Sequence, residues 1–252
     1  MSLIKEFKAN KLDVRKYSDR LSMANAAAAD IIAKIKELLQ QNDEINMIFA
    51  AAPSQSEVLE LLVQSDVDWS KVNAYHMDEY IGLEKSAPQG FGNFLSRYLF
   101  DKLPFKNVYL IDGNNDVEKE VERYSALIDV PVHIVCLGIG ENGHIAFNDP
   151  PVADFNDKAA IKPVVLDEKC RNQQVNDGCF KCIADVPKMA LTLTVPKLLS
   201  GQYMFCVVPA ATKADAVRDT CSGIYGEICP ATSLTRHDNA ILYVDADSGK
   251  YI

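Results

Sequence analysis

Apolar and polar residues alternate along this chain in two patterns, which distinguish amphipathic helices from buried strands. Helices are predicted where apolar residues recur every three to four positions, over residues 19–41, 54–63, 91–103, 117–128 and 213–221. Strands covered on both faces are predicted at the short apolar runs, which lie at 45–52, 72–77, 108–111, 132–138, 161–166, 190–195, 204–208 and 240–244.

The order of these elements predicts the fold class. Strand and helix alternate over the whole length, which is typical of one α/β domain, here residues 1–252. We expect three layers, with a mostly parallel central sheet flanked by helices, as in a modified Rossmann fold. Ligands of such sheets bind beyond the carboxyl ends of the strands, so site residues are sought in the turns that follow strands.

Charge and hydropathy exclude several classes of partner. The 252 residues carry a net charge of −9 and a pI near 5.0, which disfavours a nucleic-acid partner or an anionic membrane. No apolar run approaches the roughly 18 residues of a membrane-spanning helix, and the N-terminal residues lack the apolar stretch of a signal peptide. We therefore expect a cytoplasmic protein.

The cysteines support the same compartment. Their number is odd, seven, and most of them lie in apolar stretches, which is typical of reduced thiols. Cys179 and Cys182 form a CxxC pair, but no second pair and no histidine lies near it. We interpret this pair as two ordinary thiols and expect no metal site.

Two strand-to-helix turns carry residues suited to an anion. Ser54 and Glu57 have the spacing of a capping box, and so do Thr212 and Asp215. Lys213 lies in the first turn of its helix, where a cation is unfavourable unless an anion joins it. Free backbone N–H groups with a lysine make a phosphate site, although two ordinary capped helices with a solvated lysine give the same pattern.

Gly138, Gly140 and Gly143 match the GxGxxG pattern of a dinucleotide site after a strand. The third glycine should then open a helix, but Pro150 and Pro151 follow too soon for a crossover helix. We interpret the glycines as a tight turn that lets backbone N–H groups approach a substrate.

Candidate proton-transfer groups follow two strands. Asn142, His144 and Asp149 place an imidazole between an amide and an acid, which suits a proton shuttle near neutral pH. A packed histidine with a capping aspartate is the structural alternative. Asp78 and Glu79 are adjacent carboxylates at a strand end, and in an extended segment only one of them faces a shared pocket.

These motifs resemble a known family. The Asp-Glu-Tyr at 78–80, the GIGENGHIAFNDP segment at 138–150 and the VPKMALT segment at 186–192 are similar to those of the glucosamine-6-phosphate deaminases (isomerases). The resemblance runs from about residue 19 to residue 244. The 6-phosphogluconolactonases share the fold but differ after the Gly-His pair.

The resemblance implies an activity on a small sugar phosphate. An aminohexose 6-phosphate is opened, its C2 proton is moved to C1, and a ketohexose 6-phosphate and ammonia result. Asp78 would be the base at C2, and His144, oriented by Asn142 and Asp149, would carry the proton for ring opening. No cofactor is implied, and members of the family often form homo-oligomers. The implied substrate and phosphate ligands are Ser54, Gln55, Ser56, Glu79, Gly140, Gly143, Arg171, Thr212 and Lys213.

Three departures from the family pattern widen the range of functions. The phosphate loop, usually rich in glycine and threonine, reads AAPSQSE at 51–57, and Asp149 stands where a longer glutamate is common. The family's phosphate arginine falls nearest Gln174 or Arg171, depending on the alignment. Galactosamine 6-phosphate is thus a second possible substrate. A 6-phosphogluconolactonase-like hydrolase and a non-catalytic sugar-phosphate sensor are the alternative functions.

Overall fold

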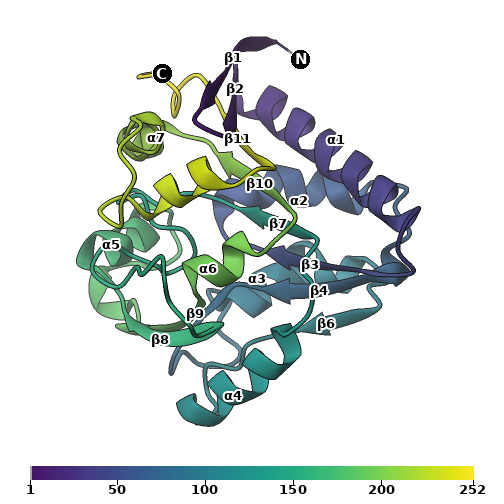
Figure 1. Ribbon diagram of the computed structural model, residues 1–252. Coiled ribbons are helices and arrows are strands. Elements are labelled where there is room, and N and C mark those ends of the chain that lie inside the picture. Colours follow the sequence, from purple (N-terminus) through teal and green to yellow (C-terminus); the bar gives the residue numbers. More distant parts are fainter. Residues whose placement is uncertain (1) are drawn as a thin grey trace.

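The central element is an eight-stranded sheet that runs through the middle of the molecule (Figure 1). The structure is a computed structural model and describes residues 2–252. All neighbouring strands are parallel except the first pair, which is antiparallel. The strands, in spatial order, are β1 (Leu3–Ala9), β2 (Leu12–Tyr17), β11 (Ala240–Val244), β10 (Tyr203–Val208), β7 (Ile134–Leu137), β3 (Ile45–Phe49), β4 (Val72–His76) and β6 (Asn107–Tyr109).

Helices cover both faces of this sheet because its strands are apolar on both sides. In β3, Met47 and Phe49 pack into one core and Ile48 into the other, as strand alternation requires. The first core is closed by α1 (Arg20–Leu39), α2 (Ser56–Val63) and α3 (Phe91–Tyr98). The second is closed by α4 (Val117–Ile128), α6 (Val195–Leu199) and α7 (Ala214–Cys221). The predicted three-layer α/β domain is confirmed.

The sheet has a switch point between β3 and β7. From β3 the chain moves outward to β4 and β6, whereas β7 returns to the other side of β3 and leads to β10 and β11. The connections that leave β3 and β7 therefore diverge and open a crevice at the carboxyl edge. The turns after β3, β4, β7 and β10 meet there.

A second, smaller sheet differs from the prediction. The runs at 161–166 and 190–195 do not extend the parallel sheet. They form β8 (Ile161–Val165) and β9 (Met189–Leu193), which pair antiparallel with each other and with β5 (Asp78–Tyr80). Because β5 follows β4 after one residue, this sheet continues from the carboxyl edge of the main sheet and fixes Asp78 there. A further helix, α5 (Glu168–Asn176), covers the same edge.

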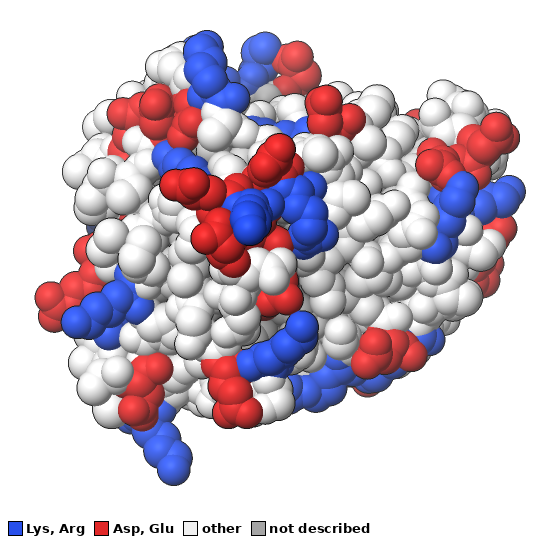
Figure 2. Space-filling model, turned by 90° about the horizontal axis from the view of Figure 1, so that it is seen from below, with Lys and Arg blue, Asp and Glu red and all other residues white. Residues whose placement is uncertain are grey.

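Two features of the surface bear on partners. On the face that Figure 2 shows, acidic and basic side chains are interspersed and no broad basic patch is visible. Within residues 2–252, no helix has the length and apolar character needed to cross a membrane.

Candidate active site

A pocket opens at the carboxyl edge of the main sheet, beside the switch point. It is lined by the turns after β3, β7 and β10, together with Asp78, the start of α3 and the end of α5. The sequence-predicted residues that it brings together are Ser54, Gln55, Asp78, Gly140, His144, Thr212 and Lys213. These residues come from four separate strand ends, as expected for a ligand site of this fold class.

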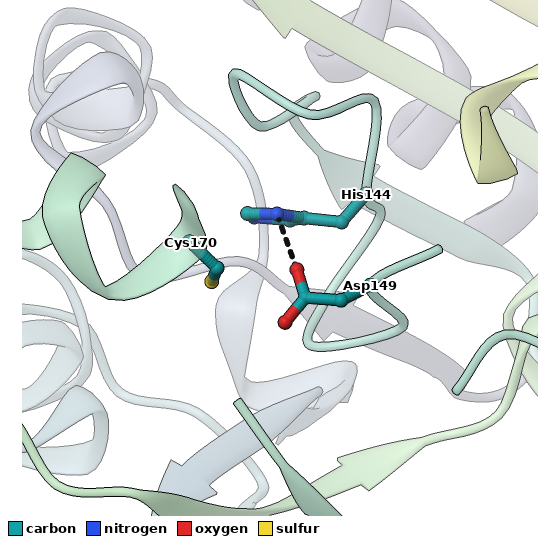
Figure 3. A group of neighbouring side chains, drawn as sticks. All are labelled: His144, Asp149 and Cys170. Atoms are coloured by element: carbon teal, nitrogen blue, oxygen red, sulfur yellow. Dashed lines mark ion pairs between the residues drawn. The ribbon is translucent and has the colours of Figure 1, made fainter. Parts of the chain in front are cut away.

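His144 is held by a hydrogen-bonded network, of which Figure 3 shows the ion pair with Asp149. Its Nδ1 lies 2.7 Å from Asn142 Oδ1 and 3.0 Å from Asp149 Oδ1. Asn142 Nδ2 donates to Asp149 Oδ1 at 2.9 Å, and the Asp167 backbone N–H donates to Asp149 Oδ2 at 2.9 Å. Two acceptor oxygens at Nδ1 fix the proton of the neutral ring there and leave Nε2 as the free nitrogen.

The carboxylate of Asp149 is charged in this environment. Burial by itself raises its pKa, but the hydrogen bonds and the charge of His144 and the hydrogen bond from Asn142 outweigh burial and lower the pKa below its usual value. This carboxylate lies 3.0 Å from His144 Nδ1 and fixes the orientation of the ring. The pair is therefore equipped to take up and release a proton.

Glycine is required where the loop passes the imidazole. A Cβ at Gly140 would lie 2.1 Å from His144 Cε1 and 2.4 Å from Nδ1. Gly143 has a φ of +84°, its N–H donates to Gly140 O at 3.0 Å, and it does not line the pocket. No helix follows these glycines before β8 begins at residue 161, so they form a tight turn and not a dinucleotide site.

The adjacent acids at the end of β4 point in different directions. Asp78 faces the pocket and is 6% exposed, and burial, together with the charge of Glu79, raises its pKa well above the usual value. Glu79 accepts backbone N–H groups of Tyr80, Phe91 and Gly92 at 2.8–3.0 Å. It ties the start of α3 to β5 and does not line the pocket, so its expected contact with substrate is not seen.

Lys213 supplies a buried cation without a hydrogen bond. It is 5% exposed, and its Nζ has no hydrogen-bond partner. Its nearest acidic atom is Glu141 Oε1, at 3.9 Å. Burial lowers the pKa of Lys213, and the charges of Asp177 and Glu141 offset part of that effect. A buried ammonium in a pocket wall, with one carboxylate at ion-pair distance and no hydrogen bond, favours an anionic ligand.

The two capping boxes are not formed. At α2 the N-cap is Gln55, with no side-chain cap, and Ser54 Oγ accepts from Gln55 Nε2 at 3.1 Å. Glu57 instead pairs through both carboxylate oxygens with Arg20, at 2.6 and 2.8 Å. The prediction failed because a strong bidentate partner outcompetes the backbone for Glu57.

The start of α7 is similar. Lys213 is the N-cap residue there without a side-chain cap, and Asp215 pairs with Arg218 at 2.7 Å. Neither helix thus has a side-chain cap. The first backbone N–H of each, of Ser56 and of Ala214, donates to a carbonyl of the preceding short 3-10 turn, that of Pro53 and of Ala211.

Six predicted residues do not line the pocket themselves: Asn142, Asp149, Ser56, Glu79, Gly143 and Arg171. Asn142 and Asp149 act on it only through His144. Arg171 Nη2 donates to the carbonyls of Ile183 and Val186, at 2.6 and 2.8 Å, and so holds the loop after α5. Gln174, the other position that the alignment allowed, does line the pocket.

Sequence reasoning missed two kinds of site residue. Arg20 lines the pocket from the first turn of α1, and its preceding strand pair was not predicted. Ala146 and Ala210 also line it, with φ of 49° and 83°. Positive φ at a non-glycine residue is strained and concentrates at functional sites, but alanine gives no sequence signal for it.

Comparisons with known proteins agree with this geometry. A family model described as glucosamine-6-phosphate isomerases/6-phosphogluconolactonase matches residues 18–243. Glucosamine-6-phosphate deaminases of Bacillus thuringiensis (strain Al Hakam) and Bacillus cereus (strain AH820) are each 33% identical over 216 residues, which is 85% of this chain and 80% of the relative.

Solved structures show the same fold. A structure described as a monomeric glucosamine-6-phosphate deaminase of the NagB superfamily has a TM-score of 0.86 and 27% identity, over 95% of this chain and 99% of the other. The 6-phosphogluconolactonase of Thermotoga maritima has a TM-score of 0.76 at 18% identity, over 92% of this chain and 98% of the other. The family expected from the motifs is confirmed: this chain belongs to the glucosamine-6-phosphate isomerase/6-phosphogluconolactonase family.

Proposed function

We propose that this chain converts an aminohexose 6-phosphate and water into a ketohexose 6-phosphate and ammonia, without a cofactor. The observation that carries the proposal is the content of one pocket. It contains a buried carboxylate at Asp78, an oriented imidazole at His144 and, at Lys213, a buried ammonium without a hydrogen bond. The deaminase relatives at 33% identity support the reaction class.

The phosphate is assigned to the side of the pocket formed after β3 and β10. Lys213 provides the charge, and the hydroxyls of Ser54 and Thr212 line the same cavity. Strands β10 and β4 are three positions apart in the sheet, which is roughly 14 Å at about 4.8 Å per strand. We expect a six-carbon sugar phosphate to span most of this distance and the side chain of Lys213 to bridge the rest.

Ring opening is assigned to His144. Nε2 of the neutral ring takes the proton of the C1 hydroxyl and returns a proton to the ring oxygen, while Asp149 stabilises the intermediate imidazolium. The C1–O5 bond breaks and an open-chain aldehyde forms. No electrons leave the substrate, so no redox cofactor is needed.

Proton transfer from C2 to C1 is assigned to Asp78. Its carboxylate removes the C2 proton, the electron pair forms an enolamine, and the same proton is delivered to C1. The raised pKa of Asp78 makes it a stronger base than a solvated aspartate. Water then adds to the C2 iminium, the C–N bond breaks, and ammonia leaves with the ketose phosphate.

The test is ammonia release from glucosamine 6-phosphate and galactosamine 6-phosphate, measured in parallel. We expect activity with glucosamine 6-phosphate and a loss of about 10²–10⁴-fold in Asp78→Asn. Opening of a phosphogluconolactone without any ammonia release would support the hydrolase instead. Thermal stabilisation by both sugars without turnover would support the sensor.

The compartment and the assembly are also proposals. All seven cysteines are free thiols in the structure, which supports a reducing cytoplasm. Self-association is common in the family, whereas one similar structure is described as monomeric. Sedimentation of the purified chain measures the state directly.

A further inference from the structure

A buried thiol lies against the imidazole–carboxylate pair, and the proposed reaction does not use it. Cys170 comes from the first turn of α5 and is 1% exposed. Three possible metal ligands, one atom each from His144, Asp149 and Cys170, lie within 4.8 Å of one another. Figure 3 shows the three side chains next to each other, the thiol approaching from the helix and the other two from the turn after β7.

The donor set fits a small tetrahedral cation, and so does the spacing of its nitrogen and oxygen atoms. Two ligands bound to zinc at about 2.0–2.2 Å lie about 3.3 Å apart at tetrahedral angles. His144 Nδ1 and Asp149 Oδ1 are already 3.0 Å apart, so these two atoms need to move apart only slightly to admit an ion between them. Nitrogen, oxygen and sulfur in one set select a borderline-soft ion such as Zn²⁺ over the hard ion Mg²⁺.

The charges also balance. Zn²⁺ bound to one thiolate, one carboxylate and one neutral imidazole gives a net charge of zero, which a buried site tolerates. The thiol loses its proton to solvent when the Zn–S bond forms. The imidazole loses none, because its single proton moves from Nδ1 to Nε2 when Nδ1 binds the ion. One proton is therefore released for each ion bound.

We propose that His144, Asp149 and Cys170 bind a Zn²⁺-like divalent cation, and that this ion inhibits the enzyme. The ion takes Nδ1 of His144, which otherwise faces Asn142 and Asp149, and places a proton on Nε2. His144 can then no longer accept the hydroxyl proton of the closed sugar. The inhibitory half of the proposal rests on the proposed function, whereas the binding half does not.

Cobalt provides the first test, because thiolate–Co²⁺ bonds absorb in the near ultraviolet. The chelator-treated full-length protein is titrated with Co²⁺, and we expect a charge-transfer band that saturates at one equivalent. The band should vanish in Cys170→Ser and in Cys170→Ala. It should persist in the Cys179→Ser/Cys182→Ser double variant, which removes the more accessible pair of thiols.

Zinc provides the second test. In ammonia-release assays, Zn²⁺ should inhibit the wild type, excess chelator should restore the rate, and Mg²⁺ should have no effect. Loss of a direct ligand should raise the half-inhibitory Zn²⁺ concentration by more than the roughly 10–100-fold known for outer-sphere partners. Because Cys170 has no step in the reaction, both variants should keep the wild-type rate without metal, and thermal melts check their folding.

Each result decides the proposal. A charge-transfer band that survives in both Cys170 variants, or a wild type without any band at saturating Co²⁺, would overturn the binding site. Equal Zn²⁺ inhibition of the wild type and Cys170→Ala would overturn the inhibitory role. If no amino sugar is a substrate, the cobalt titration still measures the site, so failure of the function and failure of the site are separable.

Discussion

Replacement of Gly140 by alanine should remove most of the activity while the fold survives. The new Cβ would lie 2.1, 2.3 and 2.4 Å from Cε1, Nε2 and Nδ1 of His144. Ordinary contacts of this kind are 3.4 Å or more, so the ring must move by more than 1 Å. The backbone at Gly140 does not have a positive φ, so strain at that residue itself is small.

The expected loss follows from that displacement. A misplacement of about 1 Å in a reacting group costs on the order of 10²-fold in rate. This corresponds to about 2.7 kcal/mol of transition-state stabilisation. The displaced ring also breaks its contacts at Nδ1 with Asn142 and Asp149, which are 2.7 and 3.0 Å long. The imidazole would then lack both its position and its fixed tautomer.

The assay is kcat/KM for ammonia release, with thermal melts as the measure of folding. Gly226→Ala is the matched control, because a Cβ there meets nothing within 4 Å and φ is not positive. It should leave the rate unchanged. A folded Gly140→Ala enzyme with a rate within about threefold of the wild type would refute the assignment of His144 to proton transfer.

Three further predictions concern the charged residues around the pocket. Lys213→Met should raise KM for the sugar phosphate by about 10–100-fold, which is the value of a charge-assisted hydrogen bond. It should also raise Tm, because burial disfavours the charged form of the lysine and so lowers its pKa. An unchanged KM would contradict the phosphate assignment. Glu79→Gln should destabilise the fold by about 1–3 kcal/mol in denaturant titrations, because one of the backbone N–H groups that Glu79 binds loses its acceptor. KM should stay unchanged if the role of Glu79 is structural. Asp78→Asn should raise Tm at neutral pH. A carboxyl whose pKa is raised in the folded state destabilises the fold once the pH exceeds its pKa in the unfolded chain, near 3.8, so the gain in Tm should shrink to zero below that pH. A gain in Tm that does not depend on pH would contradict the raised pKa of Asp78.

The parallel sheet could be predicted because its strands are apolar on both faces. The runs that form β3, β7, β10 and β11 are short and apolar apart from Asn46, which is typical of buried strands. The turn residues Asp78, His144 and Lys213 could then be placed at one edge, since parallel strands end on the same side.

The remaining features depend on contacts that periodicity does not contain. β1 reads LIKEFKA and is mostly exposed, so its polar alternation resembles a solvated segment until β2 pairs with it. Arg20 reaches the pocket only because that hairpin sets the start of α1. The orientation of Arg171 is decided by two carbonyls of a loop 12 and 15 residues away. No local pattern encodes these distances.

The charge pattern of the pocket favours a substrate that carries both a cation and an anion. Lys213 is buried without a hydrogen bond, and Asp78 is buried with a raised pKa, so each charge is unfavourable in the free protein. A phosphate compensates the first charge and an ammonium at C2 compensates the second. A phosphorylated lactone brings only the anion and leaves the carboxylate of Asp78 uncompensated. We therefore expect the same pocket walls to favour an amino sugar phosphate over a lactone by charge, although the two family activities share one fold.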